Sequence, residues 1–327
     1  MELGLSLPQG AHNDLRRDVT GVARAAEQAG FASLWAYERV LFPVTPAQGM
    51  YGVPGLSWLK YYEYCADPLT VLAMAGAVTE KVRLGTSILV GPLHPTLALA
   101  RALATLDQAT GGRVIAGLGS GWAAEEYRAM GVDFSSRGQA LDETIDGLRA
   151  LLGPDPVTYR DSHIAVEEAL VNPKPVTQIP ILLGGGSSER AFRRIARKGD
   201  GWLPVNMAGP VLADSWKRLL DLAGMEGRDR QRMRLIPVAH VTLADKPAGS
   251  GRQPFQGILD EVIDDIAATA EAGADELIVG LDASVASSAE LIDKALALMQ
   301  AVTAAGLRNS AAAAAPASRG LAAGIHP

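Results

Sequence analysis

Two stretches of this chain share one pattern: Arg113-Val-Ile-Ala-Gly-Leu-Gly-Ser-Gly-Trp-Ala-Ala-Glu-Glu126 and Ile179-Pro-Ile-Leu-Leu-Gly-Gly-Gly-Ser-Ser-Glu-Arg190. In each, a short apolar run leads into glycines and serine, and a helical pattern follows. Glycines let backbone N–H groups approach a ligand closely, and the N-terminus of a helix adds partial positive charge. The two turns therefore predict a site that holds one phosphate-bearing ligand from two sides. The alternative is that they are only tight strand-to-helix connections.

Eight short apolar runs recur along the chain, separated by segments in which apolar residues follow helical spacing. Most runs are continuously apolar rather than alternating, which is typical of parallel strands covered on both faces. This alternation favours an α/β fold, a (β/α)8 TIM barrel with insertions, over an open doubly wound sheet, although periodicity alone does not close a barrel. The runs are residues 3–7, 33–37, 83–90, 114–118, 181–183, 201–205, 235–243 and 276–280.

Two connections are too long to be simple turns. Residues 157–180 contain a predicted hairpin that pairs 157–159 with 163–166. Residues 38–67 are rich in proline, glycine and aromatic residues, and long loops inside compact domains are usually lids or binding segments. Aromatic side chains in this loop could cover a flat ligand or form a small core under the loop. They are Tyr51, Trp58, Tyr61, Tyr62 and Tyr64.

Glycine marks the end of three predicted helices, at Gly30, Gly199 and Gly273. We expect a left-handed conformation at each, because glycine adopts it without steric cost. We assign residues 1–308 to one barrel domain. Residues 309–327 are mostly alanine, serine, glycine and proline, and we expect a disordered tail because such a segment buries little apolar surface.

The overall composition excludes several classes of protein. The formal net charge is −6 and there is no long basic run, which argues against a nucleic-acid partner. The N-terminus lacks a signal-peptide pattern and no apolar stretch is long enough to span a bilayer, so we expect a cytoplasmic protein. Cys65 is the only cysteine, which rules out an intramolecular disulfide and argues against a metal cluster.

Residues that follow the predicted strands are candidates for chemistry, because barrel active sites lie at the C-terminal ends of the strands. Glu38 follows the second strand and could give or take a proton, or could simply pair with Arg39 or another cation. His94 precedes a predicted helix and could contact a ligand or be structural. His12, His163 and His240 show no metal-ligand spacing with one another, and neither a hydrolase elbow nor a nucleotide-triphosphate loop is present.

Taken in order, these stretches resemble the luciferase-like monooxygenase superfamily, and within it the branch of oxidoreductases that depend on the deazaflavin coenzyme F-420. The resemblance covers roughly residues 1–305. It depends on the two glycine turns and on three further stretches, residues 3–8, 26–35 and 82–113. The order and spacing of these stretches are far more specific than any one of them.

The resemblance implies a barrel in which the cofactor ring lies over a bulge at the end of the third strand, where a non-prolyl cis peptide is usual. The matching residues are Ser87, Ile88 and Leu89. It also implies that the cofactor phosphate meets Gly119, Ser120, Gly121 and Trp122 in one turn and Gly184, Gly185, Gly186 and Ser187 in the other. The implied cofactor is F-420, with FMN as the alternative.

The chain departs from many deazaflavin relatives after the second strand, where Glu38-Arg39 replaces an Asp-His pair. We take Glu38 as the first candidate for the proton source and Tyr37 as the second. The implied reaction is hydride transfer between the cofactor and a small organic substrate. Family members are commonly homodimers, and an FMN-dependent monooxygenase would need a separate reductase. Two further alternatives are a non-catalytic flavin-binding barrel and an unrelated phosphate-binding barrel such as a sugar-phosphate isomerase.

Overall fold

The computed structural model describes residues 1–10, 14–249 and 251–308, so the predicted tail at 309–327 lies outside the described residues. The central sheet is entirely parallel, in the order β10-β9-β8-β5-β3-β2-β1-β14-β11, with the short β4 paired to β5. Its strands are β1 (Glu2–Ser6), β2 (Ser33–Ala36), β3 (Arg83–Thr86), β4 (Leu89–Val90), β5 (Val114–Gly119), β8 (Ile181–Gly184), β9 (Gly201–Leu203), β10 (Arg234–Leu235), β11 (Val238–His240) and β14 (Glu276–Gly280).

The two ends of this order meet and close the sheet. β10 and β11 are halves of one run on either side of Pro237, and they pair with β9 and β14 respectively. A parallel bridge between Val205 and Val238 joins the extension of β9 to β11. The chain therefore forms the predicted (β/α)8 barrel, in which the seventh strand is interrupted by a proline that cannot donate a ladder hydrogen bond.

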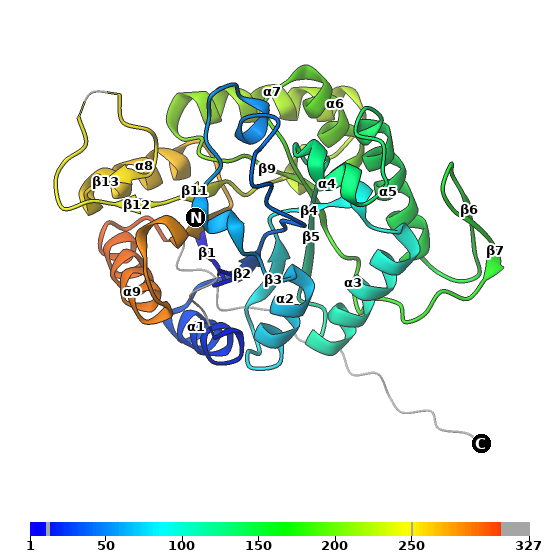
Figure 1. Cartoon of the computed structure of the whole chain (residues 1–327), viewed down its shortest axis with the longest axis horizontal. Coiled ribbons are helices and arrows are strands. Elements are labelled where there is room, and N and C mark those ends of the chain that lie inside the picture. The colour runs from blue at the N-terminus through cyan, green and yellow to red at the C-terminus, as the bar shows by residue number, and fades with distance from the viewer. Residues whose placement is uncertain (11–13, 250, 309–327) are drawn as a thin grey trace.

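Helices surround the strands and form a ring around the central sheet (Figure 1). They are α1 (Leu15–Ala29), α2 (Pro68–Gly76), α3 (Thr96–Thr110), α4 (Ala124–Ala129), α5 (Arg137–Leu151), α6 (Glu189–Lys198), α7 (Gly209–Met225), α8 (Leu259–Glu271) and α9 (Ser288–Ala304). In α9, the buried residues recur at positions 291, 295, 298, 299 and 302, along one face of the helix, and the Ser287 side chain accepts a hydrogen bond from the backbone N–H of Glu290. An apolar stripe and a serine cap are the local reasons for this helix.

Apolar residues of the strands lie on both faces of the sheet. In β8, Leu182 faces the barrel interior with Trp35 and Ile278, whereas Ile181 and Leu183 belong to the cluster shared with the helices. Successive side chains of a strand point to opposite faces, so both faces require apolar residues. The continuous apolar runs in the sequence arise from this double coverage.

The ends of the helices follow the sequence in two of the three predicted cases. Gly30 and Gly273 have φ of 86° and 90°, as predicted, but Gly199 has φ of −84° in extended backbone. The prediction for Gly199 is wrong because the chain leaves α6 directly into β9 without a left-handed turn.

The predicted hairpin is present as β6 (Val157–Arg160) paired antiparallel with β7 (Ala165–Ala169), and it projects outside the helix ring in Figure 1. A separate short pair joins β12 (Thr242–Leu243) to β13 (Gln256–Gly257). Turns of 3₁₀ helix cover Met50–Gly52, Lys60–Glu63, Gly91–Leu93, Arg230–Arg232 and Asp282–Ser284.

Candidate functional site

A parallel barrel collects the residues that follow its strands at one end. The bulge after β3 and the two glycine turns, residues 119–122 and 184–187, meet there around the Ile88 side chain. A Cβ added at Gly119 would lie 2.8 Å from Ile88 Cδ1, and one added at Gly184 would lie 2.9 Å from Ile88 Cγ2. A side chain at either position would therefore have to displace the Ile88 side chain. The structure brings together the three segments to which the sequence assigned the cofactor.

The bulge has the backbone feature that the resemblance implied. The peptide bond between Ser87 and Ile88 is cis. The chain then returns to the sheet as β4, which pairs with the end of β5. Thr86 holds the strand beside the bulge, because its hydroxyl donates to Gly117 O and accepts from Gly117 N at 2.8 and 2.9 Å.

Backbone donors are free at both glycine turns. Within the described residues, the N–H groups of residues 120–122 and 185–187 donate no hydrogen bond. The second turn is exposed and leads into α6, whose first turn is capped by Ser188 through the backbone N–H of Ala191. A Cβ added at Gly186 would have nothing within 4 Å, so packing does not explain that glycine. Free N–H groups at the start of a helix fit an anionic group such as phosphate.

Glu38 lies behind the bulge with both carboxylate oxygens occupied. Oε2 accepts a hydrogen bond of 2.6 Å from Val90 N, and Oε1 lies 2.9 Å from His94 Nε2. Burial lowers the pKa of His94, but the hydrogen bond and negative charge of Glu38 outweigh it and the pKa is raised. The Glu38 side chain is 7% exposed and the His94 side chain is 25% exposed, so His94 is the more accessible member of the pair.

Arg39 makes the ion pair that the sequence could not assign. Its partner is Glu126 of α4, at 3.0 Å, and both side chains are buried. The Arg39 guanidinium also lies 4.7 Å from the centre of the Trp122 ring. The ion pair therefore connects the segment after β2 to the first glycine turn. Burial raises the pKa of Glu126, and the positive charge of Arg39 opposes that rise.

The loop after β2 packs onto the same turn. The Trp122 ring makes edge-to-face contacts with Trp58 and Tyr51, with ring centres 4.3 and 5.4 Å away, and the Trp122 carbonyl accepts a hydrogen bond from Gln48. Trp58, Tyr61 and Tyr62 join this small core, whereas Tyr64 is exposed. The Trp122 side chain is thus part of the loop core, and its backbone N–H has no acceptor among the described residues.

Tyr37 belongs to a second buried group at the same end of the barrel. Its hydroxyl has no hydrogen-bond partner, and burial raises its pKa. The nearby Asp282 follows β14, and burial raises its pKa to about 6. Burial lowers the pKa of His240 to about 4, and its Nδ1 lies 3.5 Å from the Tyr61 hydroxyl. Tyr37 and His240 are therefore uncharged at neutral pH, and Asp282 titrates close to it.

Sequence reasoning missed Asp282 and the pairing of Arg39 with Glu126. Asp282 had a usable signal, since it follows the eighth strand as Glu38 follows the second. Nothing in the described residues groups three or more histidine, cysteine, aspartate or glutamate side chains around a possible metal ion. Among the described helices, none combines the length and apolar character needed to cross a membrane.

Comparison with known proteins gives one family match. The family model for luciferase-like monooxygenase matches residues 1–253. An uncharacterized protein of Mycobacterium tuberculosis (strain ATCC 25618 / H37Rv) is 33% identical over 217 residues, which are 63% of this chain and 74% of that protein. The FMNH(2)-dependent dimethylsulfone monooxygenase of Pseudomonas putida is 35% identical over 144 residues, 43% of this chain and 39% of that protein.

Among solved structures, an F420-dependent secondary alcohol dehydrogenase in complex with an F420-acetone adduct superposes with a TM-score of 0.72. The identity is 19%, and the match covers 92% of this chain and 99% of that chain. Similarity at this level of identity shows the shared fold.

Proposed function

We propose that this chain, which belongs to the luciferase-like monooxygenase family, is an oxidoreductase that binds a phosphate-bearing deazaflavin, F420, and acts on a small organic substrate. The observation that carries the proposal is the set of free backbone N–H groups at residues 120–122 and 185–187, on either side of Ile88. An open position at Gly186 next to a helix N-terminus supports the placement of the phosphate there.

FMN is the second candidate cofactor. It is favoured by the 35% identity to an FMNH(2)-dependent monooxygenase, whereas an F420-dependent dehydrogenase shares the fold. Both cofactors carry a phosphate, so the glycine turns suit either one. When bound, either would supply hydride chemistry, and reduced FMN would in addition react with oxygen.

The chain's own residues would bind the ring, exclude water and handle a proton. Ile88 presents an apolar side chain between the two turns and would support one face of the ring. The loop core around Trp58 covers the first turn and would exclude water from it.

For the proton, we propose that Glu38 and His94 act as a pair. Both Glu38 oxygens are occupied, so the carboxylate would position His94 and keep a proton on its ring. His94, as the more exposed member, would exchange that proton with the substrate. The buried hydroxyl of Tyr37 and the carboxyl of Asp282 are the other groups at this end that could hold a proton.

The test is a parallel fluorescence titration with oxidised F420 and FMN, followed by turnover assays. F420 should bind at least about tenfold more tightly, and F420-dependent oxidation of a secondary alcohol such as 2-propanol should then proceed without oxygen. Preference for FMN together with oxygen-dependent turnover would instead assign a monooxygenase supplied by a separate reductase. Tight binding without turnover on any substrate tested would favour a non-catalytic flavin-binding protein, and binding of neither would overturn the proposal.

A further inference from the structure

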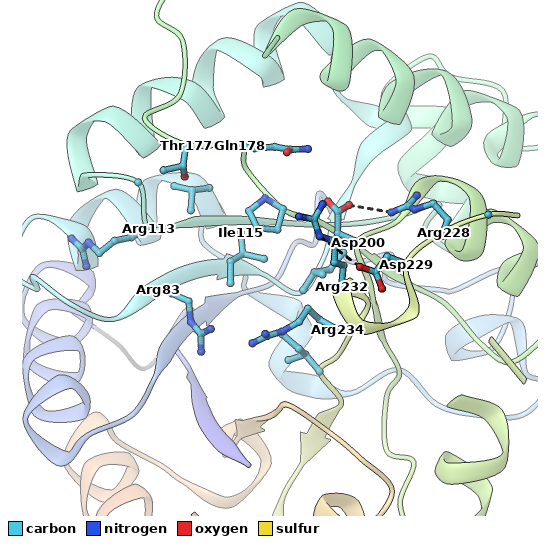
Figure 2. Close-up of a pocket in the computed structure, with 16 residues that line it drawn as sticks. Arg83, Arg113, Ile115, Thr177, Gln178, Asp200, Arg228, Asp229, Arg232 and Arg234 are labelled. Carbon is cyan, nitrogen blue, oxygen red and sulfur yellow. Dashed lines mark hydrogen bonds and ion pairs between the residues drawn. The ribbon is translucent and has the colours of Figure 1, made fainter. Parts of the chain in front are cut away.

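A pocket lies at the opposite end of the barrel from the glycine turns. Its volume is about 670 Å³, and it is lined where strands begin rather than where they end. Arg83 is the first residue of β3, Arg234 is the first residue of β10, and Arg113 immediately precedes β5. Figure 2 shows these residues, with the Arg113 side chain pointing away from the other labelled side chains. We call it the arginine pocket, and its size is in the range of small-molecule sites.

Positive charge dominates the lining. Five arginines line the arginine pocket, against two carboxylates, Asp200 and Asp229. Asp200 is already engaged by Arg149 and Arg228. The arginines are Arg83, Arg113, Arg228, Arg232 and Arg234.

Three of these arginines keep unused donors. Arg83 donates through Nη2 to Glu2 and Glu276, and within the described residues its Nε and Nη1 donate to nothing. Arg232 is 88% exposed and lies 3.9 Å from Asp229. Arg234 is 45% exposed and lies 3.6 Å from Asp275. Both distances are too long for a hydrogen bond, so these guanidinium groups remain available for a ligand.

Arg113 lines the pocket but offers a ligand no donor. Its guanidinium is fully occupied by four carbonyl oxygens and the Thr79 hydroxyl, at 2.8 to 3.0 Å. The carboxylates of Glu27 and Glu80 also act on it electrostatically. The groups available to an anion are therefore those of Arg83, Arg232 and Arg234.

The rest of the lining is apolar. Ile115, Leu182 and Ile236 belong to the core of the barrel interior, and they also line the arginine pocket. An anion that sits among the guanidinium groups would therefore have an apolar surface on which to place its body. Sites that bind small molecules commonly combine an apolar wall with a few convergent polar groups.

We propose that the arginine pocket binds a small organic oxyanion, a carboxylate or a phosphate ester with an apolar body. Arg232 and Arg234 would supply charge-assisted hydrogen bonds, and the free arm of Arg83 would add a third. In Figure 2 the Arg234 side chain extends along the lower side of the pocket toward Arg83, so one anionic group could meet both. This inference is independent of the redox function proposed for the other end of the barrel.

Phenyl phosphate and benzoate are suitable probes because they join the same apolar ring to the two kinds of oxyanion. Calorimetric titration should detect binding of at least one of them, and the one that binds identifies the anion class. Benzyl alcohol, which lacks the charge, should bind at least about tenfold more weakly. Failure of both anions to bind, or equal binding of benzyl alcohol, would overturn the proposal.

Variants test whether the anion binds in the arginine pocket. Arg232→Gln/Arg234→Gln should weaken anion binding by about tenfold or more. The single variant Arg232→Gln should fold normally, because the Arg232 side chain is 88% exposed. It should lose less anion affinity than the double variant. The matched control Arg24→Gln/Arg101→Gln removes two exposed charges from α1 and α3 and should change the affinity by less than about twofold.

A phosphate ester could also bind at the glycine turns, and Gly186→Val separates the two sites. Affinity that survives Gly186→Val and falls in the Arg232/Arg234 variant supports the arginine pocket. The reverse result, or an affinity unchanged by the loss of both arginines, would contradict it.

Discussion

Asp282 gives the sharpest prediction about stability. Burial raises its pKa from 3.8 to about 6, so the folded protein holds a proton that the unfolded chain releases. At about 1.36 kcal/mol for each pH unit, this corresponds to a destabilisation of about 3 kcal/mol when Asp282 is charged. This destabilisation is absent below pH 3.8, grows as the pH rises toward 6, and stays constant above about pH 6.

Asp282→Asn removes the charge and keeps the shape of the side chain. We expect the variant to be more stable than the wild type at pH 7.5, by up to about 3 kcal/mol, and the difference to vanish toward pH 4. Urea unfolding followed by tryptophan fluorescence at several pH values measures this. A variant of equal or lower stability at pH 7.5, or a difference that does not change with pH, would refute the reasoning.

Asp133→Asn is the matched control. Asp133 is an exposed carboxylate, and its hydrogen bonds from Ser135 and Ser136 lower its pKa to about 2. Removing this charge should therefore lower stability at neutral pH, the opposite sign from Asp282→Asn.

Three other predictions concern the site. Gly121→Val should destabilise the protein by about 2–4 kcal/mol, because Gly121 has φ of 61° and a Cβ there would lie 2.7 Å from a side chain of β4. Urea unfolding measures this, and unchanged stability would contradict the prediction. Arg39→Met should lower the free energy of unfolding by about 3–5 kcal/mol, because it leaves the buried Glu126 carboxylate unpaired. Adding Glu126→Gln should restore part of the lost stability, and no recovery would argue against an electrostatic cause. Glu38→Gln should lower the pKa of His94 in an NMR titration, since the raised pKa depends on the Glu38 carboxylate. In the wild type this pair stabilises the fold fully below the unfolded His pKa of about 6.5, and the stabilisation is lost as pH rises through the folded value; a His94 pKa unmoved by the substitution would remove this role.

Much of the fold could be predicted because a parallel barrel has a strong local signature. Each strand is buried on both faces, so segments such as β5 and β8 appear as continuous apolar runs followed by glycine. Closure of the barrel was predicted, but the periodicity of the strands alone does not require it. It depends on pairing across the break at Pro237, and the pairing of β10 with β9 and of β11 with β14 is set by tertiary contacts.

The positions of the two glycine turns at one end of the barrel could be predicted from residue type and order, and their role as the cofactor site stays a prediction. The partners of the charged side chains could not be predicted. Arg39 follows Glu38 in the sequence, yet its ion-pair partner is Glu126 and Glu38 contacts His94. The first pair forms where the loop after β2 packs onto α4, and the second forms where the end of β2 meets the segment before α3. No spacing in the sequence encodes either contact.

The measurement closest to the central claim is the affinity of Gly186→Val for F420 and FMN, compared with the wild type in the same fluorescence titration. Gly186 lies in open space, so the variant should fold with unchanged stability, while the added side chain blocks the approach of phosphate to the backbone N–H groups. The account predicts at least about a tenfold loss of affinity, about 1.4 kcal/mol, for whichever cofactor the wild type binds. Equal affinity in a folded variant would contradict the assignment of the glycine turns as the cofactor site.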